Sequence, residues 1–338
     1  MNAIRQSLRH KDALQPTLGA TLYAFGGWLG GMTLLIVSSH WLLLAAGTLL
    51  LAHAMVIAAY MLHECAHQAV FRKREHNAAM GEVFSWISGG CYNSFDQIRS
   101  KHMHHHVDNA DIVAFDYRGF LQRHPVLMRI MRALEWCYVP AVELMLHAMM
   151  VVAPFMLESR RASRKRVLLV LAVRGSLFVA LAVLAPIAAV LYGVAYMLFM
   201  TVMRFMDAFQ HNYELYHSLD QGGGSPHKGD KVYEQSHTFS NPVSMTYPWL
   251  NRLTLNFCYH NAHHEKPTVP WYRLPELHRE YFGEDDGQVI PFREQLKAFH
   301  HQRIPRILSL EDESEDFRER MARGQGVGAD GVSFLTAL

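Results

Sequence analysis

Two long stretches without charged residues constrain the fold of this chain most. Residues 17–62 contain no Lys, Arg, Asp or Glu, and residues 167–203 contain only Arg174. Apolar stretches of this length are typical of membrane-spanning helices. As a single helix, the first stretch would be about 69 Å long, whereas the hydrocarbon core of a bilayer is about 30 Å thick. The stretch must therefore turn back on itself.

A short break divides each stretch into two spans. The polar residues SSH at 38–40 interrupt the first stretch, and Pro186 interrupts the second. We therefore predict an all-α integral membrane protein in which four transmembrane helices form two hairpins. The predicted spans are residues 17–38, 41–62, 167–185 and 188–205. The rest of the chain would form a helical cap outside the bilayer.

A third apolar segment, 138–157, contains Glu143, His147 and Pro154. We expect it to be a helix at the membrane interface, with a fifth span as the alternative. Clusters of Lys and Arg favour four spans, because basic loops stay in the cytoplasm and four spans keep every cluster on one side. These clusters lie at 5–11, 72–74 and 160–166. The cap is thus predicted to face the cytoplasm.

The domain organisation and the excluded partners follow from charge and cysteine content. We expect one domain over residues 1–310 and a charged, poorly ordered tail over 311–338. The net charge of +2 is too small to indicate a nucleic-acid partner. The four cysteines show no paired spacing and no CxxC motif, so they predict neither a zinc site nor a disulfide framework.

Histidines are concentrated where the spans meet the predicted cap. The chain has 22 of them in 338 residues, and many occur in four motifs: HECAH at 63–67, HMHHH at 102–106, DAFQH at 207–211 and YHNAHH at 259–264. On a helix, side chains three and four residues apart share one face. Three of the motifs therefore present several imidazoles together, and DAFQH presents His211 with Asp207. All four motifs would lie at the cytoplasmic boundary.

Such a concentration of imidazoles predicts a metal centre. Eight or nine imidazoles are more than one ion can bind, so two ions are the simplest interpretation. Imidazole suits iron, copper, zinc and nickel, whereas calcium and magnesium prefer oxygen ligands. Iron with O₂ fits the setting best, because an apolar substrate offers only C–H bonds to react.

Three longer stretches resemble the histidine boxes of the membrane fatty acid desaturase family. They are HECAHQAVF at 63–71, HMHHHVDNADIVAFD at 102–116 and HNAHHEKPTVPWYRLPEL at 260–277. The resemblance covers about residues 20–285. It implies two iron ions, O₂ as co-substrate and no catalytic residue beyond the metal ligands. The ligands that it implies are His63, His67, His102, His105, His106, His211, His260, His263 and His264. His104 falls outside the pattern.

Four further residues are candidates for binding the metals or supporting their ligands. Asp207 lies four residues before His211, where some animal relatives carry an asparagine that acts through water. Glu64 directly follows a ligand of the first box. Asn109 and Asp111 follow the second box and are candidates for hydrogen bonds to ligand imidazoles, as is common around metal sites.

The resemblance implies removal of two hydrogens from an acyl chain, carried on a lipid, on coenzyme A or on acyl carrier protein. The chain has no haem, flavin or iron–sulfur motif, so a separate electron donor such as a ferredoxin is expected. The same box spacings also occur in hydroxylases and ketolases of acyl chains or carotenoids, which is the alternative function. A membrane metal transporter is a remote alternative, because transporter ligands lie near the membrane midplane.

Overall fold

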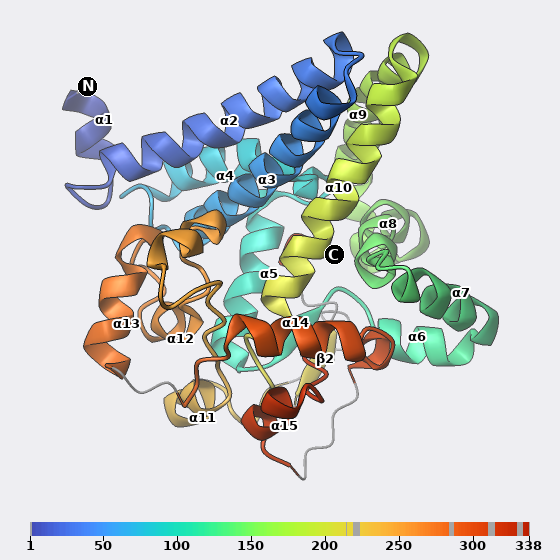
Figure 1. The fold of residues 1–338 in the computed structure, drawn as a ribbon. Coiled ribbons are helices and arrows are strands. Elements are labelled where there is room, and N and C mark those ends of the chain that lie inside the picture. Colours follow the sequence, from blue (N-terminus) through green and yellow to red (C-terminus); the bar gives the residue numbers. More distant parts are fainter. Residues whose placement is uncertain are drawn as a thin grey trace. The chain divides into compact units, whose positions relative to one another are not determined.

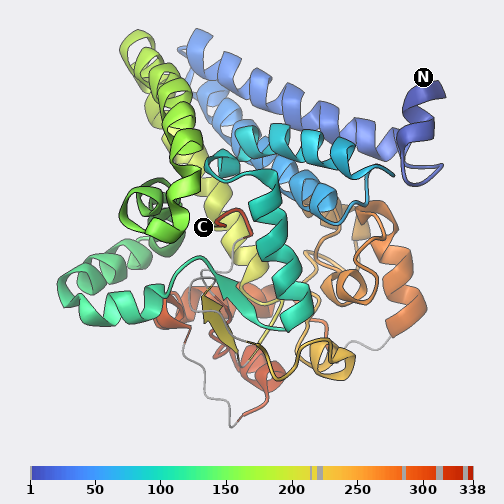
Figure 2. The same ribbon diagram turned by 180° about the vertical axis from the view of Figure 1, so that it is seen from behind.

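The computed structural model describes residues 2–213, 215–218, 224–283, 287–309, 315–329 and 334–337. Over these ranges the protein is mostly helical (Figures 1 and 2). The α-helices are α1 (Asn2–Ser7), α2 (Leu14–Val37), α3 (Trp41–Ala66), α4 (Arg74–Ser88), α5 (Phe95–Asp108), α6 (Tyr117–Arg123), α7 (Pro125–Trp136), α8 (Ala141–Met156), α9 (Arg164–Leu184), α10 (Pro186–Asp207), α11 (Lys231–Ser236), α12 (His260–Glu265), α13 (Leu274–Phe282), α14 (Phe292–His301) and α15 (Phe317–Arg323). Two short strands, β1 (Asp111–Val113) and β2 (Tyr216–Ser218), pair in parallel.

Among the described residues, four helices are long and apolar enough to cross a membrane, which confirms the predicted fold class. They are α2, α3, a helical stretch over Glu158–Leu184 that includes α9, and α10. The turn between α2 and α3 falls at the predicted polar break, where His40 caps α3 by accepting a hydrogen bond from the Leu42 amide. Pro186 is the first residue of α10, where its missing N–H costs nothing.

The third apolar segment forms α8, which has 16 residues. A span needs about 20 residues, so α8 is shorter than the four helices that could cross the bilayer. The interfacial position of α8 stays a prediction.

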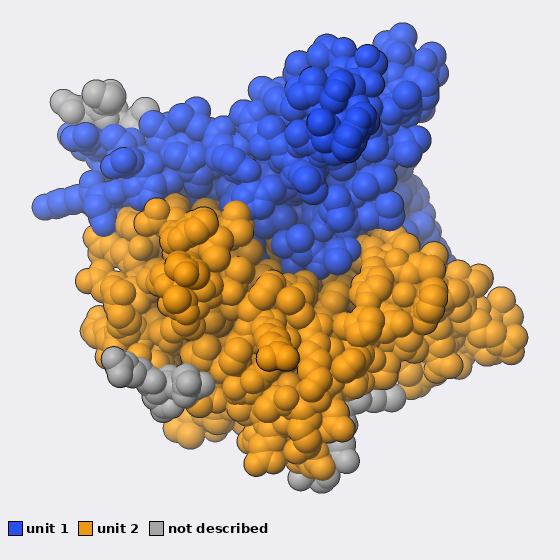
Figure 3. Space-filling model, viewed as in Figure 1, with its two compact units in different colours: residues 1–98, 148–202, 338 blue, residues 99–147, 203–337 orange. Residues whose placement is uncertain are grey.

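The chain divides into two compact units, which Figure 3 distinguishes by colour. Unit 1 comprises residues 1–98, 148–202 and 338, and unit 2 comprises residues 99–147 and 203–337. Within unit 1, α2 and α3 pack closely, because Gly31 lies against Gly47 and Leu51. A Cβ at Gly31 would come within 2.9 Å of the Gly47 carbonyl oxygen.

The described residues of unit 2 form three buried apolar clusters. One joins α6, α7 and α8, a second joins the end of α10 to α14 and α15, and a third joins α12 to α13. In both ribbon views α12 and α13 lie on one side of α5, and α6 and α7 lie on the other. The parallel pairing of Asp111 with Tyr216 brings the chain that follows α5 beside the chain that follows α10.

The expected poorly ordered tail falls partly outside the described residues, since 311–314, 330–333 and 338 are not among them. Within the described part of the tail, the structure places α15, whose Phe317 and Met321 are buried in the second cluster. Further on, Thr336 is buried, and its carbonyl accepts a hydrogen bond of 2.9 Å from the Lys101 ammonium group.

Candidate metal centre

Seven of the nine predicted ligands lie in unit 2, on three elements. Helix α5 carries the HMHHH motif, α12 carries the HNAHH motif, and His211 lies four residues after the end of α10. Helix α5 ends because Asn109 adopts a left-handed backbone conformation (φ 49°), which asparagine tolerates better than most residues. His211 is held in place by a backbone bridge to Thr238.

Four imidazoles from these three elements converge on one point. Each of them offers a ring nitrogen within 4.8 Å of the other three. The Nε2 atom of His211 lies 3.0 Å from Nε2 of His105 and 2.8 Å from Nε2 of His260. The fourth ring, His264, lies with its centroid 4.6 Å from that of His211 and is fully buried.

The partners of the Nδ1 atoms decide which ring nitrogens carry protons. His105 Nδ1 donates to the Ala110 carbonyl at 3.0 Å, because a carbonyl can only accept. His264 Nδ1 donates to the Glu234 carboxylate at 2.8 Å. His211 Nδ1 donates to Thr238 Oγ1 at 3.2 Å, since the Thr238 hydroxyl already donates its own proton to the Glu234 carbonyl.

In a neutral imidazole with a protonated Nδ1, Nε2 carries a lone pair instead of a proton. The Nε2 atoms of His105, His211 and His264 are therefore all acceptors, and no proton is available to bridge His105 and His211 at 3.0 Å. Lone pairs at this separation repel each other, whereas a cation between them would bind all of them. The residues present thus fit a metal ion held by imidazole nitrogens.

Electrostatics keep these rings neutral at physiological pH. Burial lowers the pKa of His105 to about 4, although the Ala110 carbonyl acts in the opposite direction. Burial, followed by the charges of neighbouring histidines, lowers the pKa values of His211, His260 and His264 well below the usual range. A metal ligand must be unprotonated, so these shifts favour metal binding.

A second group of imidazoles lies beside the first in unit 2. His106 Nε2 is 3.2 Å from Nε2 of His102 and 3.3 Å from Nε2 of His263. The two groups are neighbours, because the rings of His106 and His264 lie 4.1 Å apart. Burial lowers the pKa of His263 to about 3 and that of His102 well below its usual value.

The remaining two predicted ligands lie in unit 1, at the end of α3. His63 and His67 are both buried, and their Nε2 atoms are 3.2 Å apart. The i, i+4 spacing of HECAH therefore places both rings on one face of the helix, as the sequence predicts.

The comparison with known families agrees with this chemistry. A family model described as fatty acid desaturase matches residues 39–295, well over half of the chain. The chain belongs to the fatty acid desaturase family. A search of curated proteins found no match. The matched region contains all four histidine motifs, and membership of this desaturase family implies an oxidoreductase.

In this member of the family, Glu234 contacts the histidine groups although the sequence did not predict it. It lies on α11 and is buried; one carboxylate oxygen accepts from His264, and the other contacts the Lys231 ammonium group. It also lies within 4.8 Å of ring nitrogens of His106 and His264. Burial raises the pKa of Glu234, and the hydrogen bond and charge of Lys231 act against that rise. No spacing pattern links α11 to the histidine boxes, so only the fold reveals this contact.

The four secondary candidates occupy other positions. Three of the candidates are acidic: Asp207, Glu64 and Asp111. Among the described residues, none of the three belongs to a group of side chains whose ligand atoms lie within 4.8 Å of one another. Asp207 is the last residue of α10, and its charge raises the pKa of Lys101, which burial lowers overall to about 7. Asn109 donates from its amide to the carbonyls of His227 and Asp230 and so holds that loop.

His104, which falls outside the box pattern, lies at the surface of α5. Its side chain is 53% exposed, and its Nδ1 lies 2.9 Å from an oxygen of Asp108. It therefore points away from the ring nitrogens that converge inside unit 2.

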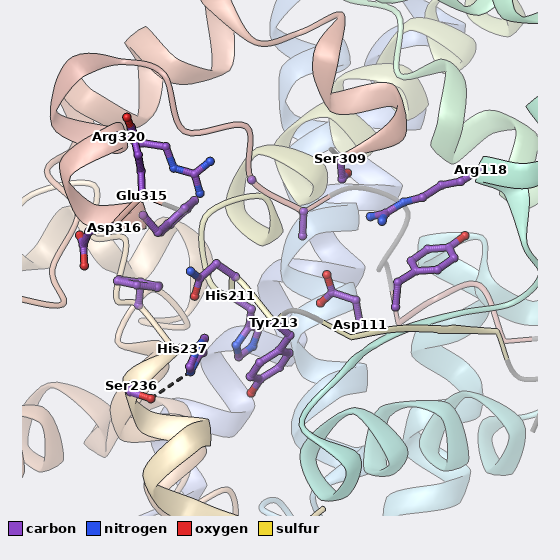
Figure 4. A pocket seen from close by; sticks show the side chains of 16 residues that line it. Asp111, Arg118, His211, Tyr213, Ser236, His237, Ser309, Glu315, Asp316 and Arg320 are labelled. Atoms are coloured by element: carbon purple, nitrogen blue, oxygen red, sulfur yellow. Dashed lines mark hydrogen bonds between the residues drawn. The ribbon is translucent and has the colours of Figure 1, made fainter. Parts of the chain in front are cut away.

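A polar pocket of about 510 Å³ reaches the metal centre within unit 2 (Figure 4). Its lining includes His211, Tyr213 and several charged side chains, among them Asp111, Arg118 and Arg320. An acyl chain needs an apolar passage, so this pocket suits water and protons instead.

Proposed function

We propose that this protein is an O₂-dependent di-iron desaturase that introduces a double bond into a fatty acyl chain. The observation that carries the proposal is the convergence of acceptor nitrogens from His105, His211 and His264, which calls for a cation. The reaction joins one saturated acyl chain, one O₂, two electrons and two protons, and yields one alkene and two water molecules.

The nine histidines divide between two ions in this proposal. One ion would be held by His105, His211, His260 and His264. The other would be held by His102, His106 and His263 together with His63 and His67. Support for the second set comes from the Nε2 contacts within each unit and from the order of the histidine boxes in the sequence.

Iron is the metal that this donor set supports best. Structural zinc is usually bound by four ligands that include thiolates, whereas the two groups here consist of imidazoles. Bound iron would supply the oxidising power to take hydrogen from an unactivated C–H bond with O₂.

The side chains of the protein position and protect this chemistry. Glu234, Thr238 and the Ala110 carbonyl fix the tautomers of three ligands, so that each Nε2 lone pair faces the metal. Burial of the ligands excludes competing protons. The polar pocket beside His211 gives water and protons a path to the cap surface that is separate from the acyl chain.

The setting of the reaction follows from the four candidate spans. We propose that the acyl substrate enters from the bilayer and that the metal centre lies on the cytoplasmic side, where the basic clusters are expected. Electrons would arrive from a separate carrier such as a ferredoxin.

Expression in a host with simple lipids tests this function. Mass spectrometry of the fatty acids should reveal a new cis double bond, and the product formed under ¹⁸O₂ should contain no label. His105→Ala should abolish the product, whereas the neighbouring His104→Ala should retain it. A labelled hydroxyl or keto group would instead assign the chain to hydroxylation or ketolation.

A further inference from the structure

A stack of aromatic rings leads away from the metal ligand His211. The ring of Tyr213 lies parallel to that of His211, with centroids 4.4 Å apart and an interplanar angle of 19°. The ring of Tyr233 lies 6.0 Å from that of Tyr213 at an angle of 18°. Tyr233 also stacks with His227, with ring centroids 3.6 Å apart, and with His237, with ring centroids 4.0 Å apart.

The stack runs from the interior to the surface of unit 2. His211, Tyr213 and Tyr233 are buried, whereas His227 and His237 are half-buried. Figure 4 shows His211, Tyr213 and His237 on the wall of the polar pocket. Next to Tyr233 in the chain, Val232 is 82% exposed. Within these residues, aromatic rings are thus in near-continuous contact from the metal centre to the α11 surface.

The surface at the outer end of the stack carries exposed positive charge. The side chains of Lys228 and Lys231 are 60% and 59% exposed, while the carboxylates that they contact, on Asp108 and Glu234, are almost fully buried. The exposed carboxylate of Asp230 is engaged with the first backbone amides of α11.

This surface also has an apolar centre. Val232 and Val107 are both exposed, and a hydrogen bond of 2.9 Å from the Gly229 amide to the Val107 carbonyl joins their two segments. An apolar centre beside positive charge is complementary to a protein with an apolar contact area and an acidic rim.

We propose that the Tyr233–Tyr213–His211 stack is the route by which electrons reach the metal centre, and that a small acidic one-electron carrier protein docks on α11. This inference rests on the proposed function, which consumes two electrons per double bond. In each transfer the carrier's reduced centre would lose one electron, which metal ions held by the box histidines would take up. The electron passes through the rings without residing on them, so no bond is broken and no proton moves.

Flash photoreduction tests the route directly. A ruthenium photoreductant is attached to Val232→Cys in a Cys137→Ser background, because the remaining cysteines are buried. Reduction of the iron centre is followed by absorbance after the flash. Tyr233→Leu should slow this reduction at least about tenfold, and Tyr233→Phe, which keeps the ring, should restore it.

The natural exposed cysteine provides a matched control. Cys137 directly follows α7, which lies on the opposite side of unit 2 from α11 in both ribbon views. Photoreduction of the iron centre from a ruthenium label at Cys137 should proceed at the same rate with and without Tyr233→Leu. Equal slowing from both label sites, or no slowing from position 232, would overturn the route.

Iron content and reduction by dithionite are measured on the same samples to separate the two proposals. Normal iron and normal dithionite reduction in Tyr233→Leu, with slow photoreduction, support the route. Normal iron with unaltered photoreduction overturns the route and leaves the desaturase proposal intact. Absence of iron from the wild-type protein overturns both.

Binding of a carrier tests the docking surface without any turnover. With a plant-type ferredoxin as the probe, Lys228→Glu should weaken binding to the metal-free protein about tenfold at low ionic strength, and less at high salt. Lys297→Glu makes the same charge change on α14, away from α11, and should leave binding unchanged. Equal effects of the two substitutions would refute α11 as the docking surface.

Discussion

The carboxylate of Glu234 offers a sharp test of how the fold supports the metal. Glu234→Gln keeps the size of the side chain and an oxygen that can accept from His264 Nδ1, but it removes the negative charge. Glu234→Ala removes the acceptor altogether and leaves a buried N–H without its partner. The ion pair with Lys231 adds little to either effect, because that ammonium group is 59% exposed.

The expected magnitudes follow from these contacts. Loss of a partner that orients a metal-binding histidine typically costs about 10–100-fold in metal affinity, which is about 1.4–2.8 kcal/mol. We expect Glu234→Gln near the lower end of this range. Glu234→Ala should fall at the upper end, because a buried donor left unpaired costs about 1–3 kcal/mol by itself.

The assay is competition for iron against a chelator, with iron content read by mass spectrometry. Glu294→Gln is the matched control, since Glu294 on α14 pairs with Arg318 on α15 and not with a histidine of the boxes. If Glu234→Ala retained iron as tightly as wild type does, the tautomer argument for His264 would be refuted.

Three further predictions follow from the site and the spans. Metal-free protein should lose stability as the pH falls from about 6.5 towards 4. In this window the histidines of the unfolded chain become protonated, whereas buried histidines such as His105 stay neutral in the folded protein. A melting temperature independent of pH over this window would contradict the lowered pKa values. Cysteines placed at Lys165 and Lys228 should be labelled from the same, cytoplasmic side of the membrane, and labelling from opposite sides would refute the four-span topology. Asp207→Asn should retain iron and measurable desaturation, because Asp207 is absent from the convergent groups; complete loss of iron, measured by elemental analysis, would make it a ligand.

The spans and the histidine boxes could be predicted because their signals are local. A long apolar run with almost no charged residues identifies α2, α3, α9 and α10 without knowledge of any tertiary contact. Spacings of three and four residues similarly place the histidines of each box on one helix face. The family match then confirms the resemblance of the boxes.

Contacts between distant segments could not be predicted in this way. Glu234 lies 30 residues before His264, on a short helix with no motif, and Thr238 reaches His211 only because the backbone bridges there. The hydrogen bond between Lys101 and Thr336 joins residues 235 positions apart. The high charge of the tail concealed the apolar face of α15, on which Phe317 and Met321 are buried.

Metal analysis of the purified protein tests the central claim most directly. Iron, zinc and copper are quantified per chain in protein extracted from membranes, and Mössbauer spectroscopy reports whether the irons are coupled. The imidazole groups around His211 and His106 predict close to two irons per chain, magnetically coupled, with little zinc. One zinc ion per chain without iron would contradict the di-iron account.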